Sequence, residues 1–320
     1  MKKRVIIGFC ICAVLAMICA GCTKTESGEK PLRVLFSNAY YTAPYITPWN
    51  EAALEEAKKL GIELTILDAN GSQQTQLEHV NLAIADGYDG FMYLPADVDG
   101  SIPVIEALNR SGIKWLGVNS FNGEEIEEYG MKYYMGFSNR ALADTIVDIL
   151  HKYYPNGCNL VAIEGIAGHP QTIAMNNVFD EKLGPEYVWI DKQDCEFKPE
   201  VAMRKMTDML TAYGLKSKGG KIECIIAHDG GLTTGVISAL EAQGYKPGDA
   251  ALIVADSSMS IYNGLKDGWI LGTATTDPKA EGKMGVDTMY GILMGTVKPG
   301  WTVFPAPMAT KETVEQFNWY

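Results

Sequence analysis

The sequence predicts an α/β protein whose parallel sheets are divided between two domains. Short runs rich in β-branched and aromatic residues alternate with stretches of helical periodicity through most of the chain. Strands that alternate with helices form βαβ units, and such units build parallel sheets. The length of 320 residues exceeds the size at which a single hydrophobic core stops growing, so two domains are expected.

The strand-like runs can be followed in order along the chain. They are Leu32–Ser37, Ile62–Leu67, Gly90–Leu94, Ile113–Val118, Leu160–Ile163, Val188–Ile190, Ile222–Ala227, Ala251–Ala255 and Leu271–Ala274. The stretches between them are amphipathic. In Asn50–Leu60, for example, Ala53, Leu54 and Ala57 share one helical face, and the charged residues lie elsewhere. Gly61 follows directly and is predicted to end that helix.

The first residues predict an export signal. Residues 2–4 are basic, and the apolar stretch 5–20 is about as short as the shortest helix that spans a bilayer. Small residues directly precede Cys22, a pattern that resembles a bacterial lipoprotein signal. We therefore expect a signal peptide over residues 1–21, lipidation of Cys22, and a linker over residues 22–31. An uncleaved membrane anchor, the alternative, would also leave the protein tethered outside the cytoplasm.

Composition and charge exclude several classes of protein. With 47% hydrophobic and 21% charged residues, the chain is neither a disordered tail nor a multi-span membrane protein. A net charge of -12 argues against a nucleic-acid partner, which would require a surplus of Lys and Arg. Cys158, Cys195 and Cys224 are isolated, with no CxxC pair, and are predicted to be small buried apolar residues. No cofactor and no metal are expected.

Catalytic and nucleotide-binding motifs are absent from the sequence. No G-x-G-x-x-G opens a helix, and residues 230–235 have P-loop spacing but are followed by Val236 instead of Lys. The G-x-S-x-G and H-E-x-x-H motifs are also missing. A catalytic site assembled from distant residues remains an alternative, with His228, Asp229 and Asp256 as its candidates.

Polar side chains recur directly after the strand-like runs. In doubly wound sheets ligands bind beyond the carboxyl ends of the strands, so these positions are candidates for a binding site. They include Asn38, Asn70, Asp97, Asn119, Glu164, His228, Asp229, Asp256 and Thr276. The rings of Tyr40, Tyr41, Tyr45 and Trp49 follow the first run. Flat rings beside polar groups suit a polyhydroxylated ligand, although each polar residue could instead cap the following helix.

A series of segments resembles one family over nearly the whole chain after the linker. Pro44–Ile46, Leu67–Gly71 and Ala83–Gly90 resemble the type 1 periplasmic binding proteins of the ribose/galactose-like branch, the sugar-capturing components of ABC importers. Further matches follow in the same order at Gly112–Ile113, Gly136–Asn139, Glu164–Gly168, Ala227–Asp229, Ala255–Asp256 and Thr310–Val314. LacI-type repressors share that fold but begin with a DNA-binding domain, whereas an export signal and a polar linker are predicted in that place here.

The resemblance implies two Rossmann-like lobes with parallel sheets, joined by a three-segment hinge, with the ligand in the cleft between them. The implied crossings lie near Gly136–Asn139, Thr276–Pro278 and Phe304–Pro307. The N-terminal lobe would comprise residues 32–136 plus 277–304, and the C-terminal lobe residues 137–276 plus 305–320.

The resemblance also implies a set of ligand contacts. They are Tyr41, Tyr45, Ile46 and Asn119 from the first lobe and Gln171, Met175, Phe197, His228, Asp256 and Thr276 from the second. Asp256 matches a family aspartate, and its carboxylate could accept from two adjacent sugar hydroxyls, cap the helix that starts near Ser257, or do both. The family commonly has Arg near Met175, which this chain lacks. It also has Asn119 in place of Asp, His228 in place of Asn and Thr276 in place of Gln.

Together these features predict a solute-binding protein and not an enzyme. It would be an extracytoplasmic lipoprotein at the bacterial cell membrane that captures a sugar or a similar polyhydroxylated small molecule as a monomer. An ABC permease in the membrane would receive the ligand. Two alternatives stay open: a sensor lipoprotein that presents its ligand to a membrane receptor, and a secreted enzyme with a cleft site.

Overall fold

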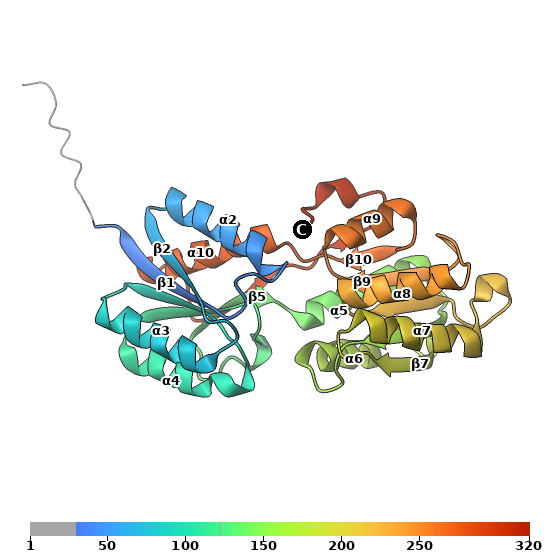
Figure 1. Ribbon diagram of the computed structural model, residues 1–320, viewed down its shortest axis with the longest axis horizontal. Helices are drawn as coiled ribbons and strands as arrows, with labels where there is room; N and C mark the ends of the chain where they lie inside the picture. Colours follow the sequence, from blue (N-terminus) through green and yellow to red (C-terminus); the bar gives the residue numbers. More distant parts are fainter. Residues whose placement is uncertain (1–29, 122) are drawn as a thin grey trace, which may run out of the picture. The chain divides into compact units, whose positions relative to one another are not determined.

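Two parallel-dominated sheets, each covered by helices on both faces, make up the protein in the computed structural model (Figure 1). The structure describes residues 30–121 and 123–320. Residues 32–320 form a single unit by their internal contacts. The predicted signal peptide, Cys22 and the linker up to residue 29 lie outside the described residues.

The first sheet has the strand order β11-β5-β4-β3-β1-β2, and all of its pairs are parallel. Its strands are β1 (Leu32–Asn38), β2 (Ile62–Asp68), β3 (Gly90–Leu94), β4 (Lys114–Val118), β5 (Tyr133–Phe137) and β11 (Gly300–Phe304). Its helices are α2 (Ile46–Lys59), α3 (Gln73–Ala85), α4 (Ile102–Ser111) and α10 (Pro278–Met294). Short 3-10 turns lie at η1 (Asp99–Ser101) and η2 (Gly123–Glu125).

Alternating side chains of the central strands fill the two cores of this sheet. Val34 and Phe36 of β1 pack with Trp49 under α2 and α10, whereas Leu35 packs with Val104 on the face that α3 and α4 cover. Every residue of β3 is buried. Burial on both faces is why these strands appear in the sequence as continuous apolar runs.

The second sheet has the order β12-β10-β9-β8-β6-β7. Its strands are β6 (Asn159–Glu164), β7 (Val188–Asp194), β8 (Cys224–Ala227), β9 (Ala251–Ala255), β10 (Gly272–Ala274) and β12 (Met308–Ala309), of which β12 alone among the described strands pairs antiparallel. Its helices are α5 (Asn139–Tyr153), α6 (Pro170–Lys182), α7 (Pro199–Tyr213), α8 (Gly230–Ala242) and α9 (Met259–Asp267), with 3-10 turns η3 (Lys216–Lys218) and η4 (Val314–Gln316). Apart from the last strand, both sheets follow the same doubly wound order.

The chain passes between the two sheets three times. It leaves β5 of the first sheet for α5, leaves β10 of the second sheet for α10, and leaves β11 of the first sheet for β12. Each passage starts at the carboxyl end of a strand. The predicted fold class, two α/β lobes joined by a three-segment hinge, is confirmed.

Three strands were not anticipated by the sequence patterns: β5, β11 and β12. β5 contains Gly136 next to a predicted crossing, β11 is an edge strand between glycine and proline, and β12 has only two residues. The first helix also begins at Ile46, four residues before the predicted start, and it ends at Lys59, just ahead of Gly61 as predicted.

Among the described residues, no helix is both long and apolar enough to span a bilayer. The three described cysteines, Cys158, Cys195 and Cys224, are unpaired and buried, as the sequence predicts. Trp49 is 1% exposed and belongs to the core under α2.

The contact between α7 and α8 depends on a glycine. A methyl group at Gly235 would lie 2.2 Å from the Pro199 carbonyl oxygen and 2.9 Å from the Ala202 Cβ. A methyl group at Gly231, in the same helix, would have no neighbour closer than 3.4 Å. We therefore predict that Gly235→Ala lowers the free energy of unfolding by about 1–3 kcal/mol through overpacking. Gly231→Ala, the matched control, should stay close to the wild type in urea unfolding. Equal stability of the two variants would contradict this packing.

Candidate functional site

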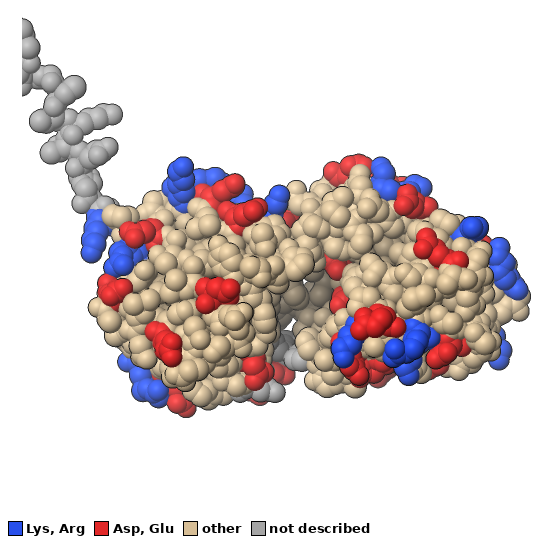
Figure 2. All heavy atoms as spheres, in the orientation of Figure 1, with Lys and Arg blue, Asp and Glu red and all other residues tan. Residues whose placement is uncertain are grey.

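Two adjoining cavities lie where the carboxyl ends of the two sheets face each other. The wide cavity, of about 540 Å³, and the hinge cavity, of about 250 Å³, share four lining residues: Tyr40, Asn119, Phe137 and Gln171. Both cavities are lined from both sheets. Figure 2 shows a recess between the two lobes, with acidic side chains at its rim. The wide cavity falls within the size range of small-molecule sites.

The first lobe contributes a buried carboxylate that the strand-end positions did not reveal. Glu281, in the first turn of α10, is fully buried and accepts from the Tyr45 hydroxyl at 2.7 Å. It also accepts from the Asn119 amide, at 3.2 Å on Oε1 and 3.1 Å on Oε2. Burial raises the pKa of Glu281 to about 7, although these hydrogen bonds oppose the shift. Glu281 therefore holds Tyr45 and Asn119 in place at the cleft.

Asn119 follows β4 and has a left-handed backbone, with φ of 67°. Asparagine tolerates this conformation better than most residues. The turn places the side chain so that Asn119 lines both cavities while its amide donates to Glu281. Tyr45 lines the hinge cavity, with its ring edge-on to Phe137 at 6.5 Å between centroids. Ile46 lines the same cavity and packs into the core beneath.

In the second lobe, Asp256 lies at the centre of a set of donors. Its Oδ2 accepts from the Gly230 N–H at 2.7 Å, and its Oδ1 accepts from the N–H groups of Ser257 and Ser258 and from the Tyr320 hydroxyl at 2.7 Å. Burial raises the pKa of Asp256 despite these bonds. The residue lines the hinge cavity and also caps the backbone ahead of α9. Thr276 lines the same cavity, and its N–H donates to the Ser257 hydroxyl at 2.7 Å.

Two further predicted contacts of the second lobe lie side by side. The Gln171 amide lines both cavities and donates to the backbone oxygen of His228 at 2.8 Å. The His228 ring is completely buried, lines neither cavity, and has no partner for Nε2 among the described residues. Burial, reinforced by the charge of Lys192, lowers the pKa of His228 to about 3. The imidazole is therefore neutral, and the backbone of this residue faces Gln171.

Phe197 lies one layer behind the wide cavity. The Phe197 ring packs on Gly165, where a methyl group would lie 2.1 Å from the Phe197 Cζ. The rings of Phe197 and His169 meet edge to face, with 5.0 Å between their centroids. His169 itself lines the wide cavity, and burial lowers its pKa. Phe197 has a φ of 54°, a conformation that is rare for a bulky residue. The close contact with Gly165 accounts for a glycine at that position.

Two other predicted contacts, like His228 and Phe197, line neither cavity. Met175 is 0% exposed and packs in the core between α5, α6 and the sheet, one helical turn beyond Gln171. Tyr41 is 37% exposed and lies on the surface of the turn before α2. The ring that does reach both cavities from this segment is Tyr40.

Several polar residues after the strands serve as helix caps. Ser138 accepts from Ala141 N at the start of α5, Asp229 from Leu232 N at the start of α8, and Asp277 from Ala280 N at the start of α10. Asp229 also lines the hinge cavity, and burial raises its pKa to about 6. Capping and lining therefore coexist in this residue.

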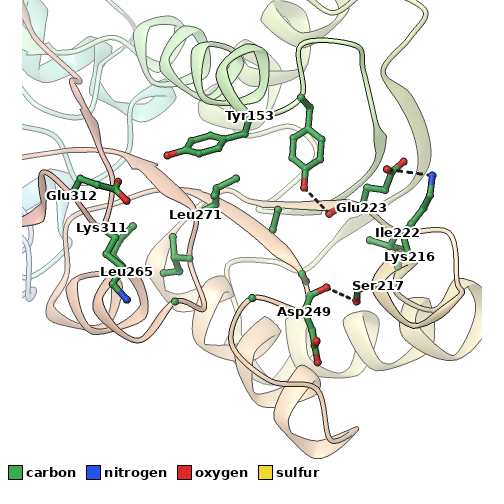
Figure 3. A pocket seen from close by; sticks show the side chains of 16 residues that line it. Tyr153, Lys216, Ser217, Ile222, Glu223, Asp249, Leu265, Leu271, Lys311 and Glu312 are labelled. Carbon is green, nitrogen blue, oxygen red and sulfur yellow. Dashed lines mark hydrogen bonds and ion pairs between the residues drawn. The ribbon is translucent and has the colours of Figure 1, made fainter.

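A third cavity lies elsewhere. It measures about 570 Å³ and lies at the amino ends of the strands of the second sheet (Figure 3). Among its lining residues, Lys216 contacts Glu223 at 3.3 Å, and the Ser217 hydroxyl donates to the Asp249 backbone oxygen. This end of a doubly wound sheet is not where ligands bind. In residues 30–121 and 123–320, no group of His, Cys, Asp or Glu is arranged to hold a metal ion.

Comparison with known proteins agrees with this architecture. The family described as "Periplasmic binding protein domain" matches residues 34–296, most of the chain. The chain belongs to the periplasmic binding protein family. The predicted resemblance to the type 1 proteins of this family is confirmed. The curated relatives that match this chain are solute-binding proteins, and this binding protein is not an enzyme.

The ribose import binding protein of Bacillus subtilis (strain 168) is 21% identical to this binding protein over 274 residues, which cover 84% of each chain. The galactofuranose-binding protein of Escherichia coli (strain K12) is 25% identical over 262 residues and 79% of each chain. Among solved structures, the arabinose-transporter binding protein of Shewanella sp. ANA-3 superposes with a TM-score of 0.72 at 21% identity. That match covers 89% of this chain and 93% of the other. A protein from Actinobacillus succinogenes 130z, solved with D-allose, gives 0.73 at 20% identity, over 90% and 100%. These structures share the fold.

The buried Glu281 carboxyl makes a prediction about pH. Its pKa is about 7 in the folded protein against an ordinary value of 4.5. Between these values the unfolded chain releases a proton that the folded protein keeps, so this group makes the wild type less stable as the pH rises. Glu281→Gln removes this decrease of stability with rising pH. The free energy of unfolding of the variant, relative to the wild type, should increase by about 3 kcal/mol from pH 4.5 to 7 and then level off.

Urea unfolding at a series of pH values measures this difference. Glu55→Gln, the same substitution at an exposed position of α2, is the matched control. A difference between Glu281→Gln and the wild type that stays constant from pH 4.5 to 8 would show that Glu281 does not ionise in a buried site.

Proposed function

We propose that this binding protein captures a neutral sugar, or a similar polyhydroxylated small molecule, between its two lobes and delivers it to an ABC importer. The observation that carries the proposal is the pair of adjoining cavities lined by rings and polar groups from both lobes. A ligand that contacts both lobes favours their closed arrangement by differential affinity, and a permease can recognise that arrangement.

The chemistry of the cleft supports a polyhydroxylated ligand. Tyr40, Tyr45 and Phe137 supply ring surfaces, and Asn119 and Gln171 supply amides, so stacking and hydrogen bonding are available in one space. Apolar walls with a few placed polar groups are typical of small-molecule sites.

The charge of the cleft supports a ligand without negative charge. No Lys or Arg is among the described residues that line the two cavities, whereas Asp97, Asp229 and Asp256 are. Desolvation lowers the pKa of His169, so this residue adds no positive charge near neutral pH. Sugar acids and sugar phosphates would meet carboxylates with no cation to offset them.

The relatives support the same class of ligand. They include proteins described as binding ribose, galactofuranose and D-xylose. Structural neighbours are described with bound L-arabinofuranose, D-allose and myo-inositol. All of these ligands are neutral and polyhydroxylated.

The proposal includes where the protein acts and which parts move. Export directed by residues 1–21 and lipidation of Cys22 would hold the protein at the outer surface of the membrane, close to its permease. Residues 32–136 plus 277–304 and residues 137–276 plus 305–320 would then move as two bodies about the three passages between the sheets.

Thermal unfolding with a panel of small molecules tests the proposal. The panel holds D-ribose, D-galactose, L-arabinose, D-xylose, D-allose, D-tagatose and myo-inositol, with D-glucuronate and ribose 5-phosphate as anionic members. A ligand that binds only the folded state raises the unfolding temperature by mass action. We expect at least one neutral member to do so and neither anionic member to do so. Stabilisation by no neutral member, or by the anionic members alone, would contradict the proposal.

A pair of glutamine variants places the binding in the cleft. Gln171→Ala removes an amide that lines both cavities, and we expect it to weaken binding of the stabilising sugar by about tenfold in calorimetry. Gln243→Ala is the matched control. Its amide also donates to a backbone carbonyl of the second lobe, that of Thr207, but it is exposed and away from the cavities. Equal losses in both variants would place the ligand elsewhere.

A further inference from the structure

A tyrosine far from any strand end forms part of the hinge cavity. Tyr320 lines this cavity together with Asp256 and Thr276. Its ring meets the ring of Tyr45 edge-on, with 5.2 Å between centroids and 86° between planes. Tyr45 belongs to the first lobe, so the two rings form a corner of the cavity to which both lobes contribute.

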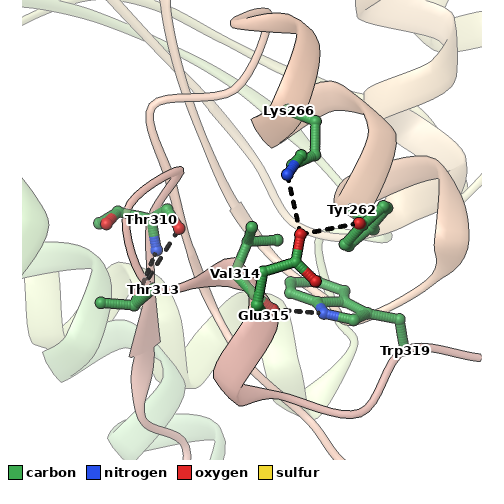
Figure 4. Close-up of polar contacts among 7 residues, drawn as sticks. All are labelled: Tyr262, Lys266, Thr310, Thr313, Val314, Glu315 and Trp319. Carbon is green, nitrogen blue, oxygen red and sulfur yellow. Dashed lines mark hydrogen bonds and ion pairs between the residues drawn. The ribbon is translucent and has the colours of Figure 1, made fainter.

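The segment that carries Tyr320 is fixed to the second lobe at several points (Figure 4). Glu315 accepts from Lys266 at 2.8 Å and from the Tyr262 hydroxyl at 3.0 Å, and the Trp319 indole donates to the Val314 carbonyl at 2.8 Å. The backbone of Tyr320 is held on both sides, by Met259 N–H to its carbonyl at 2.7 Å and by its own N–H to Ser257 O at 3.2 Å. These hydrogen bonds fix the position of Tyr320 in the second lobe.

Asp256 has little capacity left for a ligand. It accepts four hydrogen bonds, three from backbone N–H groups and one from the Tyr320 hydroxyl. Each carboxylate oxygen offers about two lone-pair sites, so Oδ1, with three donors, is fully used, and Oδ2, which accepts from Gly230, keeps one site. The three backbone donors lie at the first residue of α8 (Gly230) and in the two residues directly before α9 (Ser257 and Ser258).

The Tyr320 hydroxyl, in contrast, keeps capacity on the side of the cavity. Its proton is committed to Asp256 Oδ1 at 2.7 Å, and its oxygen also interacts with the Thr276 side chain, so the phenol oxygen keeps one lone pair that can accept from a ligand hydroxyl. A phenol that donates to a buried carboxylate is a stronger acceptor, because hydrogen bonds in a chain polarise one another. The ring also presents apolar surface to the same space.

We propose that Tyr320 contacts the ligand directly and helps to determine its specificity, and that Asp256 is a positioning residue that acts through Tyr320. The inference rests on the proposed function, because it concerns the same cleft. It changes the role expected for Asp256 from its match to the family: the carboxylate orients a phenol, and the phenol recognises the sugar.

Calorimetry with the panel sugar that gives the largest thermal stabilisation tests this inference. Tyr320→Phe keeps the ring and removes the acceptor, so we expect binding about three- to tenfold weaker. Tyr320→Ala also removes the wall, and we expect a loss of about 50-fold or more. Tyr262→Phe is the matched control. This substitution removes the hydrogen bond from the Tyr262 hydroxyl to Glu315, away from both cavities. The variant should bind the sugar with an affinity within about twofold of that of the wild type.

Monodeoxy analogues of that sugar separate direct contact from a structural role. One analogue should bind the wild type more weakly than the parent sugar does. Tyr320→Phe should bind this analogue and the parent sugar equally well, because removing the sugar hydroxyl and removing the phenol oxygen delete the same hydrogen bond. Wild-type affinity in Tyr320→Phe and Tyr320→Ala would overturn the inference. Tighter binding by either variant would also overturn it, since Tyr320 would then be an obstacle that the ligand displaces. Failure of every panel member to bind the wild type would refute the proposed function and this inference together.

Discussion

The cleft exists because the chain passes between its two sheets three times, each time from the carboxyl end of a strand. Both sheets have the same doubly wound order, so in each sheet the loops at the carboxyl ends of the strands lie near the three passages. The residues of the cleft come from these loops and from the elements that continue past them. Asn119 follows β4, Asp256 follows β9, and Glu281 lies one turn into the helix that the second passage enters.

Within that cleft, the carboxylates are occupied by the protein itself. Glu281 accepts from Tyr45 and Asn119, and Asp256 accepts from three backbone groups and Tyr320. Each carboxylate orients the phenol of a tyrosine, one in each lobe. The two tyrosine rings then meet across the hinge cavity. Two buried carboxyl groups thus orient the phenols and an amide of the cleft, an arrangement that suits neutral hydroxyl-bearing molecules.

The sequence predicts most of the fold because burial on both faces produces continuous apolar strands. It does not predict β5, β11 or β12, where glycine, an edge position or a length of two residues removes that pattern. The strand-end rule finds Asn119, Asp256 and Thr276, which do line the cleft. It cannot find Tyr320, which follows no strand directly.

Met175 and Glu281 show why the site could not be fully predicted from the sequence. Met175 occupies the position expected for an arginine, yet one helical turn separates it from the cleft-lining Gln171 and places it in the core. Glu281 lies on the otherwise small and apolar buried face of α10, with Gly282, Gly285 and Val286. A carboxylate on such a face is the signal in the sequence that could have identified it.

The central claim is that a sugar bound between the lobes draws them together. Small-angle X-ray scattering of the purified protein, with and without a saturating concentration of the sugar that stabilises it, measures this most directly. The account predicts a smaller radius of gyration with the sugar and no change with a panel member that does not bind. An unchanged radius of gyration in the presence of a sugar that calorimetry shows to be bound would contradict it.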